Sequence, residues 1–225
     1  MPDQAPLKPR VKSEETRARI LAAALDLFRR EGFEAATMRQ IASAAGVATG
    51  AAYYYFDSKD SIVLAFYDQA QQDLAPRLEQ VLASTRDLEA RLGAILDAKL
   101  HYFEATRPLL GALAAHADPD HPLSPFSPQT ESIRASDMQC FARALEGSRV
   151  RVADDLKDYL PRLLWMYQMG VLLFWIYDRS PAQRKTRALL DQSLRIVVAL
   201  IKLSGLPLMR PVRRLVRDLV DTVTA

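Results

Sequence analysis

The chain is poor in cysteine and in long uncharged runs, and each shortage excludes a class of protein. Cys140 is the only cysteine among 225 residues, so neither an intrachain disulfide nor a site with several thiolate ligands can form. The most apolar uncharged run, 163–177, is shorter than the roughly 18 apolar residues that span a bilayer. The first twelve residues lack the apolar stretch of a secretion signal. We therefore expect a cytoplasmic protein with no membrane-spanning helix.

The chain also has only a small excess of positive over negative charge. Lys and Arg number 30 and Asp and Glu number 27, which gives a formal charge of +3. This balance permits binding to phosphate groups but does not demand it. With 49% hydrophobic residues, the chain can bury a sizeable core, or a small core beside a larger one.

Strand-like alternation is absent, whereas apolar residues recur with a period near 3.6 along almost the whole chain, which predicts an all-α fold. Ser13 is expected to cap the first helix, and Gly32 to end it. Ser58 begins a longer helix that Pro76 should stop near residue 75. Further helices are expected over 76–84, 86–105, 108–116, 130–145, 152–177, 181–203 and 212–223. The proline-rich segment 117–129 is predicted to be a mobile loop.

The segment AGVATGAAYYYFDSK, residues 45–59, places three tyrosines in succession on a short predicted helix. Neighbouring helical side chains point about 100° apart, so Tyr53, Tyr54 and Tyr55 cannot all be buried on one stripe. The preceding short helix starts with a capping-box pattern at Thr37 and Gln40. Two short helices joined around a glycine, the second with polar groups exposed, are typical of a helix-turn-helix that enters the DNA major groove.

Residues 32–62 resemble the DNA-binding signature of the TetR family of bacterial transcriptional regulators. The positions that carry this resemblance are Gly32, Phe33, Thr37, Ile41, Ala42, Ala45, Gly46, Val47, Gly50, Tyr53, Phe56 and Lys59. The resemblance implies a ligand-responsive homodimer, more often a repressor, that binds a palindromic double-stranded DNA operator. It also implies a three-helix DNA-binding domain over 13–60 and a larger helical effector-binding and dimerisation domain over 61–225. The proline-rich residues 1–12, with three cations, are predicted to form a flexible arm.

The predicted recognition helix has an inner and an outer side. Ala52 and Phe56, four residues apart, should pack inward. Ala48 departs from the family pattern, in which a serine usually caps this helix. The DNA-binding residues that we predict are Thr37, Arg39, Ala48, Thr49, Gly50, Ala51, Tyr53, Tyr54, Tyr55 and Lys59. By resemblance, Thr37, Tyr53, Tyr55 and Lys59 bind phosphates, whereas Thr49, Ala51 and Tyr54 lie near base edges. The cations of the N-terminal arm, Lys8, Arg10 and Lys12, either enter a groove or are solvated.

In the larger domain, the apolar helix that includes 163–177 would need a second surface to cover it. The resemblance implies that the last two long helices form a dimer interface, and a 4, 3, 4 spacing on the second of them suits a seam. The predicted interface residues are Tyr167, Phe174, Leu190, Leu194, Val197 and Ile201. The alternative is that both are core helices of a monomer.

An effector pocket is expected to be mostly apolar, which favours an uncharged hydrophobic or aromatic small molecule and no cofactor. The residues predicted to line it are Phe66, Tyr67, His101, Tyr102, Phe103, Trp165, Met166, Met169 and Trp175.

Three other functions remain open. The segment from His116 to His121 contains two imidazoles and two carboxylates, but a solvated loop is the preferred interpretation and we assign no metal site. An all-α hydrolase or other small-molecule enzyme is the main alternative, although Cys140 has no histidine near it in sequence.

The last predicted helix has apolar residues on one side and basic residues on the other. The apolar residues are Val212, Leu215, Leu219 and Val223, and the basic residues are Arg213, Arg214 and Arg217. The helix could bind a membrane surface or a partner, but Asp218 and Asp221 favour packing of its apolar side against the body.

Overall fold

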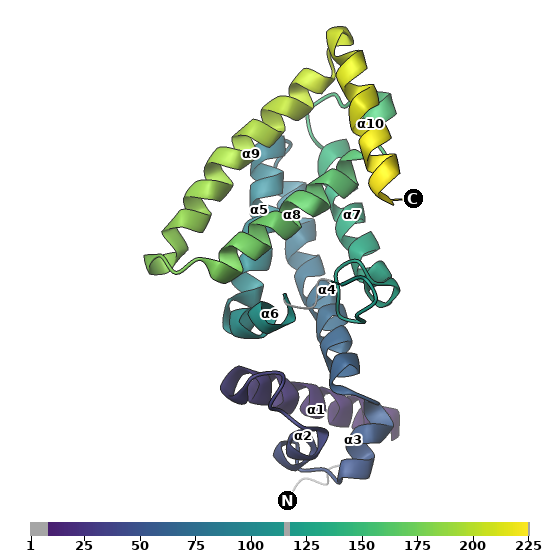
Figure 1. Cartoon of the computed structure of the whole chain (residues 1–225), viewed down its shortest axis with the longest axis vertical. Helices are drawn as coiled ribbons and strands as arrows, with labels where there is room; N and C mark the ends of the chain where they lie inside the picture. Colours follow the sequence, from purple (N-terminus) through teal and green to yellow (C-terminus); the bar gives the residue numbers. More distant parts are fainter. Residues whose placement is uncertain (1–8, 115–117, 225) are drawn as a thin grey trace, which may run out of the picture. The chain divides into compact units, whose positions relative to one another are not determined.

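The computed structural model describes residues 9–114 and 118–224, and it confirms the all-α class (Figure 1). No β-strand occurs in these two stretches. The α-helices are α1 Pro9–Glu31, α2 Met38–Ala44, α3 Thr49–Tyr55, α4 Lys59–Ser84, α5 Leu88–Phe103, α6 Arg107–Leu113, α7 Glu131–Glu146, α8 Leu160–Tyr177, α9 Arg184–Ser204 and α10 Arg210–Thr224. Over these same stretches, no helix is long and apolar enough to cross a membrane.

Contacts divide the chain into two compact units, at different places from the predicted domain boundary after residue 60. The N-terminal unit contains residues up to Gln69 together with 105–130, and the C-terminal unit contains 70–104 and the residues from Glu131 onward. Helix α4 belongs to both units, because it continues unbroken from Lys59 to Ser84.

Helix α1 begins at Pro9, so the prediction that Ser13 caps it is wrong. Proline is well suited to the first position of a helix, since its fixed φ is helical and its missing N–H would be unpaired there. Residues 9–12 are therefore helical rather than part of an arm, and residues 1–8 lie outside the described residues. The end of the helix is confirmed: Gly32 follows it with a φ of +88°, and its N–H donates to Phe28 O at 3.0 Å.

Pro76 does not end α4, which corrects a second predicted boundary. Leu74, Leu78 and Leu82 continue one apolar row across the proline, and all three are buried in the core of the C-terminal unit. A proline inside a helix costs about 3 kcal/mol, whereas burial of each leucine stabilises by about 1.5–3 kcal/mol. Packing along the row therefore outweighs the lost backbone hydrogen bond.

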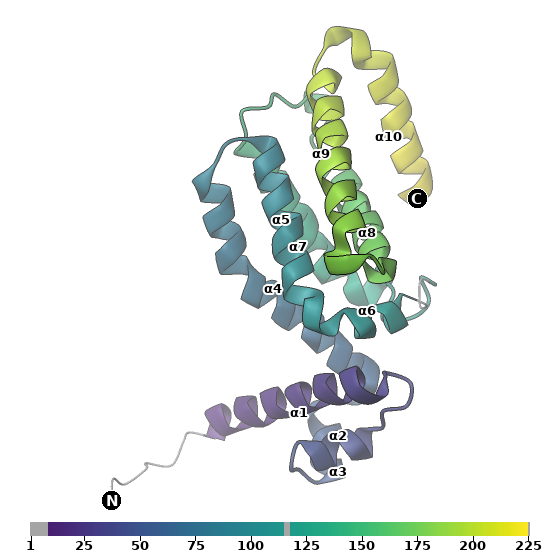
Figure 2. The same cartoon turned by 90° about the vertical axis from the view of Figure 1, so that its left-hand side faces the viewer.

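The C-terminal unit is a bundle in which α8 packs against α7 and α9, and α5 packs against α7 and α9 (Figures 1 and 2). Helix α8 begins at Leu160 rather than near residue 152, with Pro161 in its first turn. The bundle interior contains apolar side chains from α4, α5, α7, α8 and α9, among them Leu92, Ile95, Phe141, Leu164 and Val198.

The proline-rich segment, predicted to be a mobile loop, forms a compact series of turns over its described residues. The N–H groups of Ser124, Ser127 and Thr130 each donate to the carbonyl three residues earlier. This period of three turns Ser124, Ser127 and Thr130 to one side, where all three are buried. Thr130 Oγ1 donates to Ser124 O at 2.7 Å, and Ser127 Oγ donates to Pro122 O at 2.9 Å. These hydrogen bonds partner several backbone groups within the segment despite its prolines. Of the candidate metal residues nearby, His116 lies outside the described residues.

Candidate nucleic-acid interface and effector domain

Helices α2 and α3 form a helix-turn-helix around Gly46, as predicted. Gly46 has a φ of +66°, and Val47 N donates to Ala42 O at 3.0 Å, which closes the turn between the two helices. The capping box at the start of α2 is present: Gln40 N donates to Thr37 Oγ1 at 3.3 Å, and Thr37 N donates to Gln40 Oε1 at 2.9 Å.

The two sides of α3 are arranged as the sequence predicted. Ala52 is fully buried and Phe56 is 3% exposed, with the Arg17 guanidinium 4.9 Å from the Phe56 ring centroid. Tyr53 is 52% exposed and Tyr54 is 82% exposed, whereas Tyr55 is half-buried and stacks edge-to-face on Tyr54 at 5.2 Å. Two of the three tyrosines therefore point outward, and the third packs on Tyr54.

Around these tyrosines, α3 presents small residues. Thr49 and Gly50 are exposed, and Ala51 is half-buried. A side chain at position 50 would meet nothing within 4 Å in the described residues, so Gly50 is open to an approaching molecule. Ala48 occupies the N-cap position with φ −66° and ψ 147°, and no side chain caps the helix, so Thr49 does not replace the missing serine.

Lys59 is engaged inside the N-terminal unit. Its Nζ donates to Phe33 O at 2.7 Å and to Glu34 O at 3.2 Å, and lies 4.6 Å from the centre of the Phe33 ring. The ammonium thus fastens the start of α4 to the turn between α1 and α2. Arg39 on α2 is exposed, and so is Thr37, although the Thr37 hydroxyl already donates to Gln40 Oε1 at 2.7 Å.

Comparison with known proteins identifies the family. Residues 20–66 match the family model described as bacterial regulatory proteins of the tetR family, and residues 91–222 match the model described as the tetracyclin repressor-like C-terminal domain. The second match alone covers more than half of the chain. The chain belongs to the TetR family.

Individual relatives agree with this family. The chain is 40% identical over 91 residues to the HTH-type transcriptional regulator SrpR of Pseudomonas putida, which is 40% of this chain and 43% of that protein. It is 33% identical over 102 residues to the HTH-type transcriptional repressor KstR2 of Rhodococcus jostii, which is 45% of this chain and 48% of that protein. The matched part thus spans about half the length of these curated relatives. A TetR-family regulator from Streptomyces coelicolor has the same fold, with a TM-score of 0.67 at 24% identity over 93% of this chain and 96% of that one.

The structure does not gather all nine predicted effector residues of this TetR-family chain in one place. Trp165, Tyr102 and Met169 pack on the C-terminal core, whereas His101 is exposed and Met166 is 43% exposed, so these last two face away from the core. On α8, apolar residues occur on more than one side of the helix, so some of them lie in the core and others on the surface. Trp175 is buried and Phe103 is half-buried. Phe66 and Tyr67 belong to the N-terminal unit. Burial raises the pKa of the Tyr67 phenol.

A buried polar network, which the sequence did not predict, lies among these helices. Lys99 on α5 and Asp137 on α7 are 3% and 6% exposed, and Lys99 Nζ donates to Asp137 Oδ1 at 2.5 Å. Gln168 Nε2 on α8 donates to Asp137 Oδ2 at 2.6 Å, and Gln71 Nε2 on α4 donates to Asp137 Oδ1 at 2.7 Å. One carboxylate therefore joins four helices. Its partners are more than 30 residues away in sequence, and only Gln168, a polar residue within an apolar run, marks the site.

Three of the predicted interface residues are in the core instead. Leu190 and Leu194 are each 5% exposed and Ile201 is 4% exposed, so these residues pack inside the subunit. The 4, 3, 4 spacing on α9 is the stripe that faces its own bundle. Val197 and Tyr167 are half-buried, and the Tyr167 hydroxyl lies 2.7 Å from Ser193 Oγ; Phe174 remains 41% exposed.

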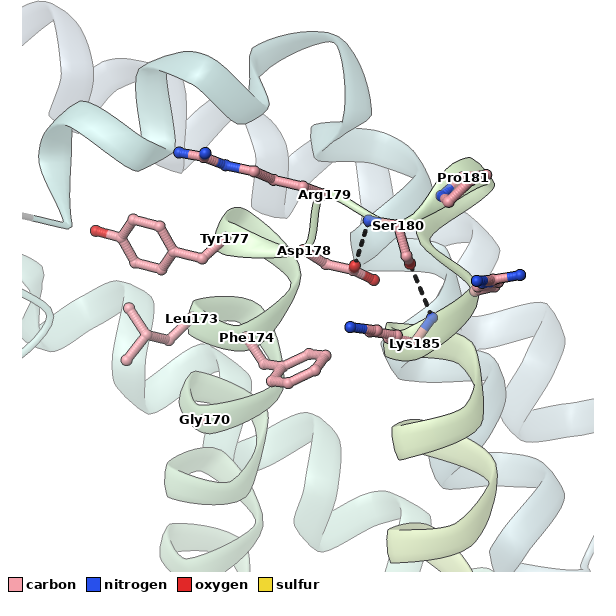
Figure 3. A pocket seen from close by; sticks show the side chains of 10 residues that line it. Gly170, Leu173, Phe174, Tyr177, Asp178, Arg179, Ser180, Pro181 and Lys185 are labelled. Atoms are coloured by element: carbon pink, nitrogen blue, oxygen red, sulfur yellow. Dashed lines mark hydrogen bonds between the residues drawn. The ribbon is translucent and has the colours of Figure 1, made fainter.

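A different apolar face is exposed on the same two helices. Its members are Met166, Leu173, Phe174 and Tyr177 on α8, and Ile196, Leu200 and Leu203 on α9, each between 41% and 61% exposed. We call these seven residues the α8–α9 face. Close to it, where α8 ends and α9 begins, an open cavity of about 760 Å³ lies over Gly170, Phe174 and Tyr177 and is edged by Arg179, Arg184 and Lys185 (Figure 3).

Proposed function

We propose that this chain is a homodimeric, ligand-responsive transcriptional regulator that binds double-stranded DNA through α3, and that it acts by binding rather than by catalysis. The observation that carries the proposal is the outward side of α3, where Tyr53, Tyr54, Thr49 and Gly50 are exposed on a helix whose other side is buried. Exposed aromatic groups on the second helix of a helix-turn-helix need a partner, and the DNA major groove accepts such a helix.

The proposed contacts fall into two classes. Tyr53, Tyr55 and Arg39 contact phosphates, since phenols and guanidinium groups donate to phosphate oxygens. Tyr54, with Thr49 and Ala51, lies nearest the base edges, where a small apolar side chain suits the thymine methyl. Thr37 and Lys59 contribute mainly by holding the helices, because their donors already bind within the unit. Ala48 and Gly50 allow the backbone to approach the groove.

The α8–α9 face supports the proposed dimer, because a monomer rarely leaves so many large apolar side chains together in water. A twofold dimer presents two recognition helices, and these would read the two halves of a palindromic operator one helical turn apart.

The proposed effector is an uncharged, mostly apolar molecule bound in the C-terminal unit, and the proposed sign of regulation is repression. Two observations support this effector class. The interior of the unit is mostly apolar, and its buried acid Asp137 is already paired with Lys99. A repressor that meets chromosomal DNA would act in the cytoplasm.

Footprinting on the DNA upstream of its own gene tests the proposed function. We expect protection of a palindromic site by the wild-type protein and loss of that protection in Tyr54→Ala. Tyr54 is 82% exposed, so this variant should fold and melt like the wild type. Absence of protection by a folded, dimeric wild-type protein, on this DNA and on a randomised duplex library, would refute the proposal.

A further inference from the structure

Helix α10 leaves exposed the apolar side that its sequence predicted to pack against the body. Val212 is 46% exposed, Leu215 is 69% exposed and Leu219 is 63% exposed, whereas Arg213 is only 9% exposed. Leu208, which is 87% exposed, lies in the 3-10 turn Pro207–Met209 directly before α10, and with it these apolar residues follow a 4, 3, 4 spacing along the chain. We call these four residues the α10 stripe.

The contacts on the other side of α10 hold it in this orientation. Arg213 Nε donates to Asp155 Oδ1 at 2.8 Å and to Oδ2 at 3.0 Å, and Arg213 Nη1 donates to Ser204 O at 2.8 Å and to Leu206 O at 3.2 Å. A buried guanidinium with four hydrogen bonds, two of them to a half-buried carboxylate, is costly to displace. Val220 is 3% exposed, and Val216 packs against the core of the unit. The helix is thus anchored by an arginine while its leucines remain in water.

The α10 stripe is continuous along the chain with the α8–α9 face. Leu203 at the end of α9 is 48% exposed and Leu206 at the corner is 50% exposed, and they lead directly to Leu208 and Val212. Figures 1 and 2 show α10 turning back from the end of α9 at this corner. In the described residues outside 166–219, the large exposed apolar side chains are Tyr53 and Tyr54 of the recognition helix, and Phe126. Nearly all the apolar surface that needs a partner therefore belongs to α8, α9, the corner and α10.

We infer that the α10 stripe docks on a second copy of this chain and enlarges the interface formed by the α8–α9 face. This inference rests on the proposed dimer. A stable interface takes roughly 20–30 residues of each partner, more than the seven of the α8–α9 face. The α10 stripe with Leu206 adds exposed apolar residues that follow this face directly along the chain.

The charges beside the α10 stripe also suit a second copy better than an anionic surface. On the exposed part of the helix, Arg210 and Arg214 lie nearer its start, and Asp218 and Asp221 lie nearer its end. Mixed charge of this kind is self-complementary across a twofold axis, because an arginine of one copy can face an aspartate of the other. An acidic membrane would instead be met by a uniformly basic rim.

Sedimentation equilibrium of the full chain with Leu215→Glu and Leu219→Glu combined tests the inference. Both positions are more than 60% exposed, so the subunit should fold, and an equal thermal melt would confirm this. We expect the dimer Kd to rise about tenfold or more, since two carboxylates would be buried in an apolar contact. Phe126→Glu, at an exposed apolar position in the other unit, is the matched control and should leave Kd unchanged. If the glutamate variant melts early, Leu215→Ser with Leu219→Ser replaces it, with the same direction expected.

A Kd for the double variant equal to that of the wild type overturns the inference. So does binding of the wild type, but not of the variant, to vesicles of phosphatidylglycerol, which would assign the α10 stripe to a membrane. Failure of the proposed function has a different signature: the wild type would then be a dimer sensitive to these substitutions that protects no upstream DNA.

Discussion

Lys99 Nζ lies 2.5 Å from Asp137 Oδ1 in the interior of the C-terminal unit, where the two side chains are only 4% and 7% exposed. A buried pair of charges gains little net stability over apolar residues of similar size, but removal of one partner leaves the other charge uncompensated. We therefore expect Asp137→Ala to destabilise the protein by about 3–5 kcal/mol, because Lys99 would remain buried.

The control for this prediction is the combined variant Lys99→Met with Asp137→Leu, which should recover most of the lost stability. Urea unfolding measures both variants. If the single and combined variants lose equal stability, the pairing of the two charges is not what Asp137 contributes.

Tyr53 and Tyr54 should differ in the kind of DNA binding that they support. Tyr53→Phe removes only a hydroxyl assigned to phosphate, so it should weaken binding to operator and to random duplex by similar factors. Tyr54→Ala should weaken operator binding more than random binding, since this residue is assigned to base edges. Fluorescence anisotropy with both duplexes at one salt concentration makes the comparison. A change in base preference caused by Tyr53→Phe would contradict the assignment.

Lys59→Ala should lower the thermal stability of the N-terminal unit, because Lys59 Nζ donates to Phe33 O and Glu34 O. The loss should be about 1–3 kcal/mol, as expected for hydrogen bonds to a charged donor. Exposed Arg39→Ala is the matched control, which should leave stability unchanged and reduce the salt dependence of DNA binding by about one phosphate contact. Equal melting of wild type and Lys59→Ala would show that the ammonium is not needed for the fold.

Ile196 and Ile201 lie on the same helix but should respond differently to a charge. Ile196 is 61% exposed, so Ile196→Glu should give a folded subunit that no longer dimerises and loses operator affinity with its second half-site. Ile201 is 4% exposed, so Ile201→Glu should unfold the subunit itself. Circular dichroism and sedimentation together separate the two results. A dimer of unchanged mass for Ile196→Glu would move the interface elsewhere.

Asp178 should make the protein sensitive to acid. It accepts from Ser180 N at 2.8 Å, from Thr186 N at 2.9 Å and from Thr186 Oγ1 at 2.7 Å at the start of α9. Burial opposes ionisation, but these hydrogen bonds outweigh it and hold the pKa of Asp178 well below its usual range. The stabilisation is thus complete above the unfolded-state pKa near 4 and is lost as pH falls below it. The melting temperature of the wild type should fall more steeply below about pH 4 than that of Asp178→Asn; parallel curves would exclude this role.

The helix-turn-helix could be predicted from sequence because its determinants are local. The capping box spans Thr37 and Gln40, the turn depends on Gly46, and Ala52 and Phe56 define one side of α3 by their spacing alone. Each of these features involves only a few neighbouring residues, so the residues that form the sequence pattern are also the residues that contact one another. The all-α class followed for the same reason.

Tertiary structure decided which side of each long apolar helix is buried and which is exposed. Helix α9 has two apolar sides, and the periodicity that indicates Leu190, Leu194 and Ile201 does not say whether they face their own bundle or a partner. Pro76 would stop an isolated helix, but its leucine row packs into the core and outweighs that local cost. Arg213 reverses the orientation expected of α10, because Asp155 and two backbone carbonyls are placed around it only once the chain has folded. The sequence by itself thus determined the helices and the recognition motif, whereas long-range burial and pairing decided which of their faces remain free to bind.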